Sequence, residues 1–190
     1  MSSKDKILSA IKESKPASTA LPVIDISAVI SFDDLKAQFK KVLETIGGVC
    51  IESVGKGEME KIVAAELSYV QNGVNTLGAY DEGLPLISAE DLASVDLAVI
   101  SGTVAVAENG AIWVSETQMV NRILPFIAQQ LIIVIEKKDI VTTMHHAYQK
   151  IDVAETGFGA FIAGPSKTAD IEQSLVIGAH GPAGLKVIIY

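Results

Sequence analysis

Cysteine, aromatic residues and positive charge are all scarce in this sequence of 190 residues. Its single cysteine, Cys50, has no second thiol for an internal disulfide and cannot by itself complete a four-thiolate zinc site or an iron–sulfur cluster. We therefore expect no metal site and no cofactor bound by this chain alone, and we place any redox metal in a partner protein.

Long hydrophobic runs are missing as well. The longest apolar block, residues 131–135, is far shorter than the ~18 residues that a membrane-spanning helix needs. No apolar signal segment follows Met1. The 15 Lys and Arg residues against 23 Asp and Glu give a formal net charge of -8, which disfavours binding to nucleic acid or to an anionic membrane. We expect a cytoplasmic protein with no membrane span and no nucleic-acid partner.

Aliphatic residues are abundant: 49% of the chain is hydrophobic although only 5% is aromatic. Ala, Val, Ile and Leu in such proportions are typical of a layered α/β core, and the length suits one domain. An amphipathic segment around Ile7, Leu8 and Ile11 is followed by a stretch with Ser and Pro that resembles an exposed linker. We expect residues 1–22 to form an arm and residues 23–190 to form the domain.

Helical and strand patterns alternate within that domain. Ser31 and Asp34 have capping-box spacing before an apolar stripe that ends at Gly47-Gly48, and a second stripe runs from Met59 to Val70. Short apolar runs that predict strands lie at residues 49–51, 97–100, 111–114, 131–135, 158–163 and 185–189. Runs of this kind suit strands buried on both faces, so we expect an α/β fold with a mostly parallel central sheet and flanking helices.

One segment interrupts the alternation. Two β-prone runs within residues 104–114 flank Asn109-Gly110, a dipeptide that tolerates positive φ angles. It predicts a β-hairpin with a type I′ turn.

The segment from Gly164 to Glu172 is the main candidate site, because it lies between the apolar run 158–163 and a helix that we expect around residues 171–177. A helix that begins beyond the carboxyl end of a strand offers free N–H groups to an anion, and Lys167 would add a positive charge. The predicted ligand-binding residues are Gly164, Ser166, Lys167, Thr168 and Glu172, with Asp170 as a candidate catalytic carboxylate. In the alternative interpretation, Ser166 or Thr168 only caps the helix, and Asp170 and Glu172 complement its dipole.

Histidines supply further candidates. His180 lies in a glycine-rich turn before the last strand, where it could act as a general acid or base. His145 and His146 are adjacent on an expected helix and point about 100° apart, so we do not expect them to bind one metal together.

Residues 164–172 and 175–182 together resemble the C-terminal signature of the lactate-utilisation (LUD) domain family. The turn at residues 107–111 resembles the family's Ala-Glu-Thr-Gly-Thr turn, with Asn109 and Ala111 in place of two threonines. Within the family, the chain is most similar to the small C subunits of lactate-utilisation systems. This resemblance implies a fold similar to sugar-phosphate isomerases and CoA transferases. It also implies a role, together with iron–sulfur partner subunits, in oxidising lactate to pyruvate, with a small organic anion bound by this chain.

The same turn suggests a different enzyme. Glu108-Asn109-Gly110 is similar to the short motif that carries the catalytic glutamate of CoA transferases. The alternative is therefore a stand-alone acyl or CoA-group transferase in which Glu108 attacks an acyl-CoA beside Asn109 and Gly110. A third hypothesis is a ligand-binding regulatory protein without catalysis. The apolar strand that ends at Tyr190 could contact a second copy of the chain, so a homo-oligomer is one of the alternatives.

Overall fold

The computed structural model describes residues 2–17, 19–20, 22–78, 88–169, 175–178 and 180–190, and helices and strands form along these ranges. The helices are α1 (Ser3–Glu13), α2 (Leu35–Thr45), α3 (Lys56–Ser68), α4 (Ala89–Ala93), α5 (Glu116–Met119), α6 (Leu124–Ile127), α7 (Met144–Lys150) and α8 (Val153–Thr156). The strands are β1 (Val49–Glu52), β2 (Gly73–Asn75), β3 (Leu97–Ser101), β4 (Val104–Val106), β5 (Ile112–Ser115), β6 (Gln130–Ile135), β7 (Ile140–Val141), β8 (Gly159–Ile162), β9 (Lys167–Ala169), β10 (Leu175–Ile177) and β11 (Gly184–Ile189).

The central sheet has five strands in the order β1-β11-β6-β3-β2, and every neighbouring pair is parallel. This confirms the expected α/β class with a mostly parallel central sheet. The apolar run in β6 is buried on both faces of the sheet, with Ile132 and Ile133 fully inaccessible to solvent. Because all five strands run in one direction, their carboxyl ends lie along a single edge, which we call the carboxyl edge.

A second, mixed sheet has the order β7-β4-β5-β8. Strands β4 and β5 form the expected hairpin, but its turn differs from a two-residue type I′ turn. Val106 N donates to Ala111 O at 2.8 Å and Gly110 N donates to Val106 O at 2.9 Å, so four residues form the turn. Gly110 has a φ of +72°, while Asn109 is not among the described residues with positive φ. The predicted hairpin is thus confirmed, with a longer turn.

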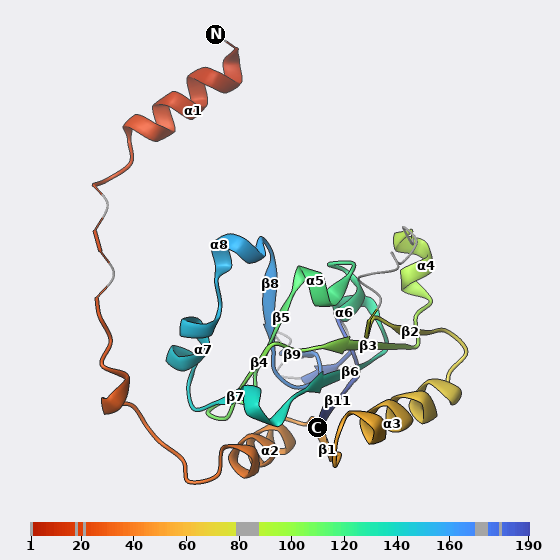
Figure 1. The fold of residues 1–190 in the computed structure, drawn as a ribbon. Helices are drawn as coiled ribbons and strands as arrows, with labels where there is room; N and C mark the ends of the chain where they lie inside the picture. Colours follow the sequence, from red (N-terminus) through yellow and green to blue (C-terminus); the bar gives the residue numbers. More distant parts are fainter. Residues whose placement is uncertain (1, 18, 21, 79–87, 170–174, 179) are drawn as a thin grey trace.

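Helices lie against both sheets (Figure 1). The core between these elements consists mainly of two apolar clusters. On one face of the parallel sheet, Met59 and Val63 of α3 pack against Val99 and Ile132. On the other face, α2 and the mixed sheet close a larger cluster that includes Phe39. The stripe predicted for α2 is therefore confirmed. The helix begins later than the capping-box spacing of Ser31 and Asp34 predicts, because its N-cap is Asp34, whose carboxylate accepts from Ala37 N at 3.0 Å.

The arm contributes nothing to these clusters in the described part of the chain. Helix α1 has no buried residue, and Ile7, Leu8 and Ile11 are each more than half exposed. Figure 1 shows α1 apart from both sheets, joined to them by an extended segment. No helix within the described ranges is long and apolar enough to cross a membrane.

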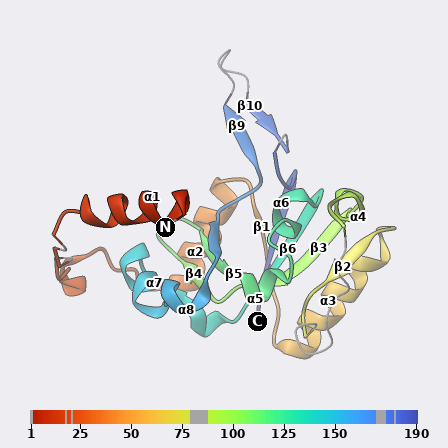
Figure 2. The same cartoon turned by 90° about the horizontal axis from the view of Figure 1, so that it is seen from above.

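The prediction of a helix around residues 171–177 is wrong for residues 175–177, which the structure describes. Leu175–Ile177 form strand β10, which pairs antiparallel with β9. Figure 2 shows these two strands projecting away from the rest of the fold. Val176 and Ile177 are β-branched and favour a strand once a partner strand is present. Residues 170–174 lie outside the described residues.

The packing of β8 on β5 generates a stability prediction. A Cβ at Gly159 would run into the ring of Trp113, so Gly159→Ala should lower the free energy of unfolding by about 1–3 kcal/mol. Gly57→Ala is the matched control, because a Cβ there meets no atom within 4 Å. In a helix, that change should stabilise by about 0.5 kcal/mol. Urea unfolding checks both variants, and equal stabilities would contradict the packing of Trp113 on Gly159.

Candidate functional site

Glu108 supports a helix from the hairpin turn. Its Oε2 accepts from Met144 N at 3.1 Å at the start of α7, and its own N–H donates to Thr142 O at 3.0 Å. Asn109 Oδ1 accepts from Ala111 N at 3.0 Å and so stabilises the turn itself. The Glu108 side chain is exposed to solvent, with one carboxylate oxygen engaged by the helix.

The two adjacent histidines face different surroundings on α7. His145 is exposed, whereas His146 is partly buried and its Nδ1 lies 2.9 Å from Thr143 Oγ1. Among the described residues, no group of three or more His, Cys, Asp and Glu side chains could hold a metal ion.

Lys167 contacts the end of α2. Its ammonium donates to the Ile46 carbonyl oxygen at 2.6 Å, which places a cation on the last turn of that helix. The last carbonyls of a helix have no partner within the helix, and a positive charge there is favourable. Lys167 therefore has a structural partner in the position for which we predicted an anion.

The 107–110 turn and the 164–167 segment, each of which contains a glycine, pack on the same residue, Ile46, the C-cap of α2. A Cβ at Gly164, where φ is +72°, would lie 2.9 Å from the Ile46 carbonyl oxygen. A Cβ at Gly110 would lie 3.1 Å from Ile46 Cδ1. The fold thus brings the 107–110 turn and the 164–167 segment together, with the Ile46 side chain between them.

The turn that carries His180 lies beside Ser166. Ser166 N donates to Pro182 O at 2.9 Å, and Gly178 N donates to Ser166 O at 3.0 Å. His180 itself is exposed. Of the remaining candidates, Thr168 is described only as a backbone position in β9, and Asp170 and Glu172 lie outside the described residues.

These candidates lie at the amino edge of the parallel sheet, opposite the carboxyl edge. Ala183 N donates to Gln129 O at 2.9 Å, immediately before β11 and β6 begin. The apolar run before residues 164–172 predicts a strand of the parallel sheet, but β8 belongs to the mixed sheet and runs antiparallel to β5. Its end therefore does not join the edge where ligands bind in parallel α/β sheets.

The carboxyl edge carries a hollow of about 590 Å³ that the sequence analysis missed. We call it the carboxyl-edge hollow. It is lined by Lys56, Met59, Glu60, Val63, Ala64 and Leu67 of α3, by Asn75, Leu77 and Gly78 after or at the end of β2, and by Ser101, Val134 and Tyr190 from the other strands. Its volume lies within the range of roughly 300–1,000 Å³ that is typical of small-molecule sites.

The α3 side of this hollow is one stripe of the helix. Its lining residues recur every three or four positions from Lys56 to Leu67, so they share a face. Lys56 and Glu60 lie in the first five positions of the helix, with Met59 between them, and only apolar lining residues follow. The hollow therefore has a charged end at the start of α3 and an apolar wall farther along the helix.

A strand–loop–helix junction forms the charged end. Strand β1 ends at Glu52, Ser53 N donates to Ile189 O at 2.8 Å, and α3 begins at Lys56 after its N-cap Gly55. The sequence signal was present in Gly55-Lys56-Gly57, which follows the apolar run 49–51 after three intervening residues. The expected type of junction thus exists, but after a different strand.

Tyr190 adds a phenol at the end of β11. Partial burial raises the pKa of Tyr190, and the carboxylates of Glu136 and Asp139 raise this pKa further, against a smaller opposite effect of Lys138. The phenol therefore stays protonated at neutral pH and presents an O–H group that can donate a hydrogen bond.

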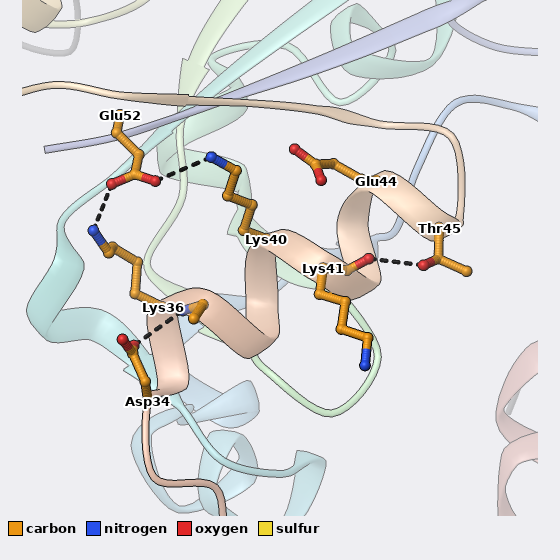
Figure 3. A pocket seen from close by; sticks show the side chains of 8 residues that line it. Asp34, Lys36, Lys40, Lys41, Glu44, Thr45 and Glu52 are labelled. Atoms are coloured by element: carbon orange, nitrogen blue, oxygen red, sulfur yellow. Dashed lines mark hydrogen bonds and ion pairs between the residues drawn. The ribbon is translucent and has the colours of Figure 1, made fainter.

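A second hollow, of about 640 Å³, lies on the outer side of α2 (Figure 3). There the Lys36 and Lys40 ammonium groups both reach the Glu52 carboxylate, at 2.5 Å and 3.2 Å. Hydrogen bonds from Lys36 and Lys40 lower the pKa of Glu52, and Glu52 raises the pKa values of both lysines. These ion pairs tie α2 to the edge strand β1, and they give the hollow a structural explanation.

Comparison with known proteins points to one family. The family model described as the LUD domain matches residues 31–190. Lactate utilization protein C of Bacillus pumilus (strain SAFR-032) is 39% identical over 90 residues, which cover 44% of this chain and 38% of that protein. The protein of the same name from Exiguobacterium sp. (strain ATCC BAA-1283 / AT1b) is 28% identical over 120 residues, covering 60% of this chain and 52% of that protein.

The chain thus spans about two fifths to half of the length of these two curated relatives. The fold resembles the crystal structure of a DUF162 family protein from Deinococcus radiodurans, with a TM-score of 0.62 and 19% sequence identity, over 85% of this chain and 99% of that one. This likeness supports the α/β fold. The expected similarity to sugar-phosphate isomerases and CoA transferases stays a prediction.

The contact of Lys167 with α2 predicts an effect on stability. Lys167→Met should lower the free energy of unfolding by about 0.5–1 kcal/mol, because the variant loses the cation at the end of α2. Lys61→Met, an exposed position on α3, is the control and should change little. Chemical denaturation compares the two. If Lys167→Met left the stability unchanged, its ammonium would not be held on Ile46, and the predicted anion contact would gain support.

The partial burial of Cys50 predicts slow alkylation of its thiol and a loss of stability at high pH. Burial raises the pKa of the Cys50 thiol to about 11, whereas an unfolded cysteine has a pKa of about 8.5. At pH 8, alkylation by iodoacetamide should be roughly two orders of magnitude slower in the folded than in the unfolded chain, because the thiolate is the nucleophile. The folded state holds its proton more tightly, so stability should also fall as the pH rises above about 8.5. Mass spectrometry follows the alkylation, and equal rates would contradict the burial of Cys50.

Proposed function

Because the chain belongs to the LUD domain family, we propose that it takes part in the oxidation of lactate to pyruvate together with iron–sulfur partner proteins, and that it binds a small organic anion itself. The observation that carries this proposal is the similarity to several proteins named Lactate utilization protein C, over up to 60% of the chain. Since those relatives extend well beyond the matched region, the activity, the substrate and the partners all belong to the proposal.

The chemistry favours a subunit over a self-sufficient oxidoreductase. Lactate gives up two electrons and two protons when it becomes pyruvate, and those electrons need an acceptor. An iron–sulfur cluster needs about four cysteine ligands, whereas this chain has only Cys50. The residues present do not fit a cluster, so we assign electron acceptance to the partners. In this assembly, the chain binds or orients the organic acid.

Reconstitution tests the proposal. We expect the purified chain to show no lactate-dependent reduction of a dye and to contain no iron, and we expect activity to appear when the iron–sulfur proteins of the same organism's lactate system are added. The partners without the chain are the control. Strong lactate oxidation by the chain alone, or full activity of the partners without it, would refute the role of a required subunit.

The alternative of a stand-alone acyl transferase makes a separate prediction at Glu108. That reaction would form a glutamyl adduct on Glu108, which hydroxylamine traps after incubation with acyl-CoA donors. With one oxygen of its carboxylate held by Met144 N, Glu108 instead has a structural role that Glu108→Gln should largely keep. Absence of an adduct across several donors would remove the transferase, and a Glu108 adduct that disappears in Glu108→Gln would establish it.

A further inference from the structure

We propose that the carboxyl-edge hollow binds a 2-hydroxy acid with a hydrocarbon side chain longer than that of lactate. The carboxylate would lie at the start of α3, and the hydrocarbon would lie on the apolar stripe of that helix. The inference rests on the proposed function for the reactant class, a hydroxy acid, and on the hollow for the location and for the side-chain length.

Three of the residues that line the hollow carry a hydrogen-bond donor in their side chain. The Lys56 ammonium comes from α3, the Ser101 hydroxyl from the end of β3, and the Tyr190 phenol from the residue after β11. None of these three side chains has a hydrogen-bond partner within the part of the chain that the structure describes. An anionic ligand would give them one. The positive end of the dipole of α3, a helix of 13 residues, acts in the same direction.

Glu60 selects among anions. It lines the hollow one helical turn after Lys56, so a ligand carboxylate bound by Lys56 has another carboxylate nearby. An acceptor at that place suits a ligand that also donates a hydrogen bond. The C2 hydroxyl of a 2-hydroxy acid donates, whereas the C2 carbonyl of a 2-oxo acid only accepts. The hollow should therefore prefer the hydroxy acid to the corresponding oxo acid.

The apolar wall sets the length of the ligand. Met59, Val63 and Leu67 follow Lys56 along α3, and Leu77 and Val134 face the same hollow. Leu67 lies eleven positions after Lys56 on the helix, which corresponds to a rise of about 16 Å. A three-carbon acid would leave most of a hollow of about 590 Å³ empty. Met59, Val63 and Val134 are themselves buried, so the accessible part of the wall comes from Ala64, Leu67 and Leu77. An acid with a longer hydrocarbon chain would cover that apolar surface.

Titration calorimetry on the full chain tests the inference with L-lactate, 2-hydroxybutanoate, 2-hydroxyhexanoate and 2-oxohexanoate as probes. Each added methylene that reaches the wall should tighten binding about fourfold. The oxo acid should bind about tenfold more weakly than 2-hydroxyhexanoate, because an acceptor would face Glu60. Equal affinities along the series, or no binding of any acid, would overturn the inference.

Variants test the two ends of the hollow separately. Lys56→Gln should lower the binding affinity for every acid about tenfold or more. Lys61 is an exposed lysine of α3 that does not line the hollow, so Lys61→Gln should leave these affinities unchanged. Ala64→Asp puts a charge on the wall at an exposed position, so it should not disturb the core. It should remove the increase in affinity that each added methylene of the ligand gives. Equal effects of the two lysine variants, or an unchanged gain with chain length in Ala64→Asp, would overturn the inference.

The outcome is distinguishable from that of the proposed function. If lactate oxidation depends on the chain while 2-hydroxyhexanoate fails to bind, the inference fails and the proposed function stands. If 2-hydroxyhexanoate binds in a Lys56-dependent way while the partner proteins oxidise lactate equally fast with and without the chain, the proposed function fails and the ligand site stands.

Discussion

The shared direction of the five central strands is the constraint on which the rest of the structure depends. Since β1, β11, β6, β3 and β2 all run parallel, each connection must return from the carboxyl edge to the amino edge. Helix α3 makes one of these returns, from β1 to β2, and covers one face of the sheet with Met59 and Val63. Its first turn therefore lies at the carboxyl edge, where the ends of three other strands supply Asn75, Ser101 and Tyr190.

The two edges of the sheet have different roles. At the amino edge, backbone hydrogen bonds join Ser166 to the turn of His180, and Lys167 is held by the end of α2. These contacts satisfy the polar groups of segments that would otherwise expose them, which is a structural role. At the carboxyl edge, Lys56, Ser101 and Tyr190 line a hollow without such contacts among the described residues. Groups that are not used by the fold are the ones available to a ligand.

Much of the fold could be predicted from local patterns, because buried strands and amphipathic helices leave a periodic signal. The run 131–135 became β6, and the stripe with Phe39 became α2. The failures concern information that is not local. Whether the run 158–163 joins the parallel or the mixed sheet depends on pairing with β5, and the partner of Lys167 is Ile46, 121 residues away in the sequence. Val176 and Ile177 form a strand because β9 lies beside them.

The candidate site shows the same limit. The rule that ligands bind beyond the carboxyl ends of parallel strands was applied to residues 164–172, although the junction with that geometry lies at Gly55-Lys56-Gly57. Sequence alone gives neither the direction of a strand nor the edge at which a loop emerges. The LUD family resemblance, by contrast, could be recognised from short motifs, since it needed no knowledge of the geometry.

Methyl-resolved NMR on the full chain with 2-hydroxyhexanoate tests most directly whether the ligand site lies at the carboxyl edge. We expect shifts of the methyl signals of Val63, Leu67, Leu77 and Val134, which line the carboxyl-edge hollow. Shifts confined to Ile46 and Ile177, beside the 164–167 segment and in β10, would contradict it and would return the site to the amino edge.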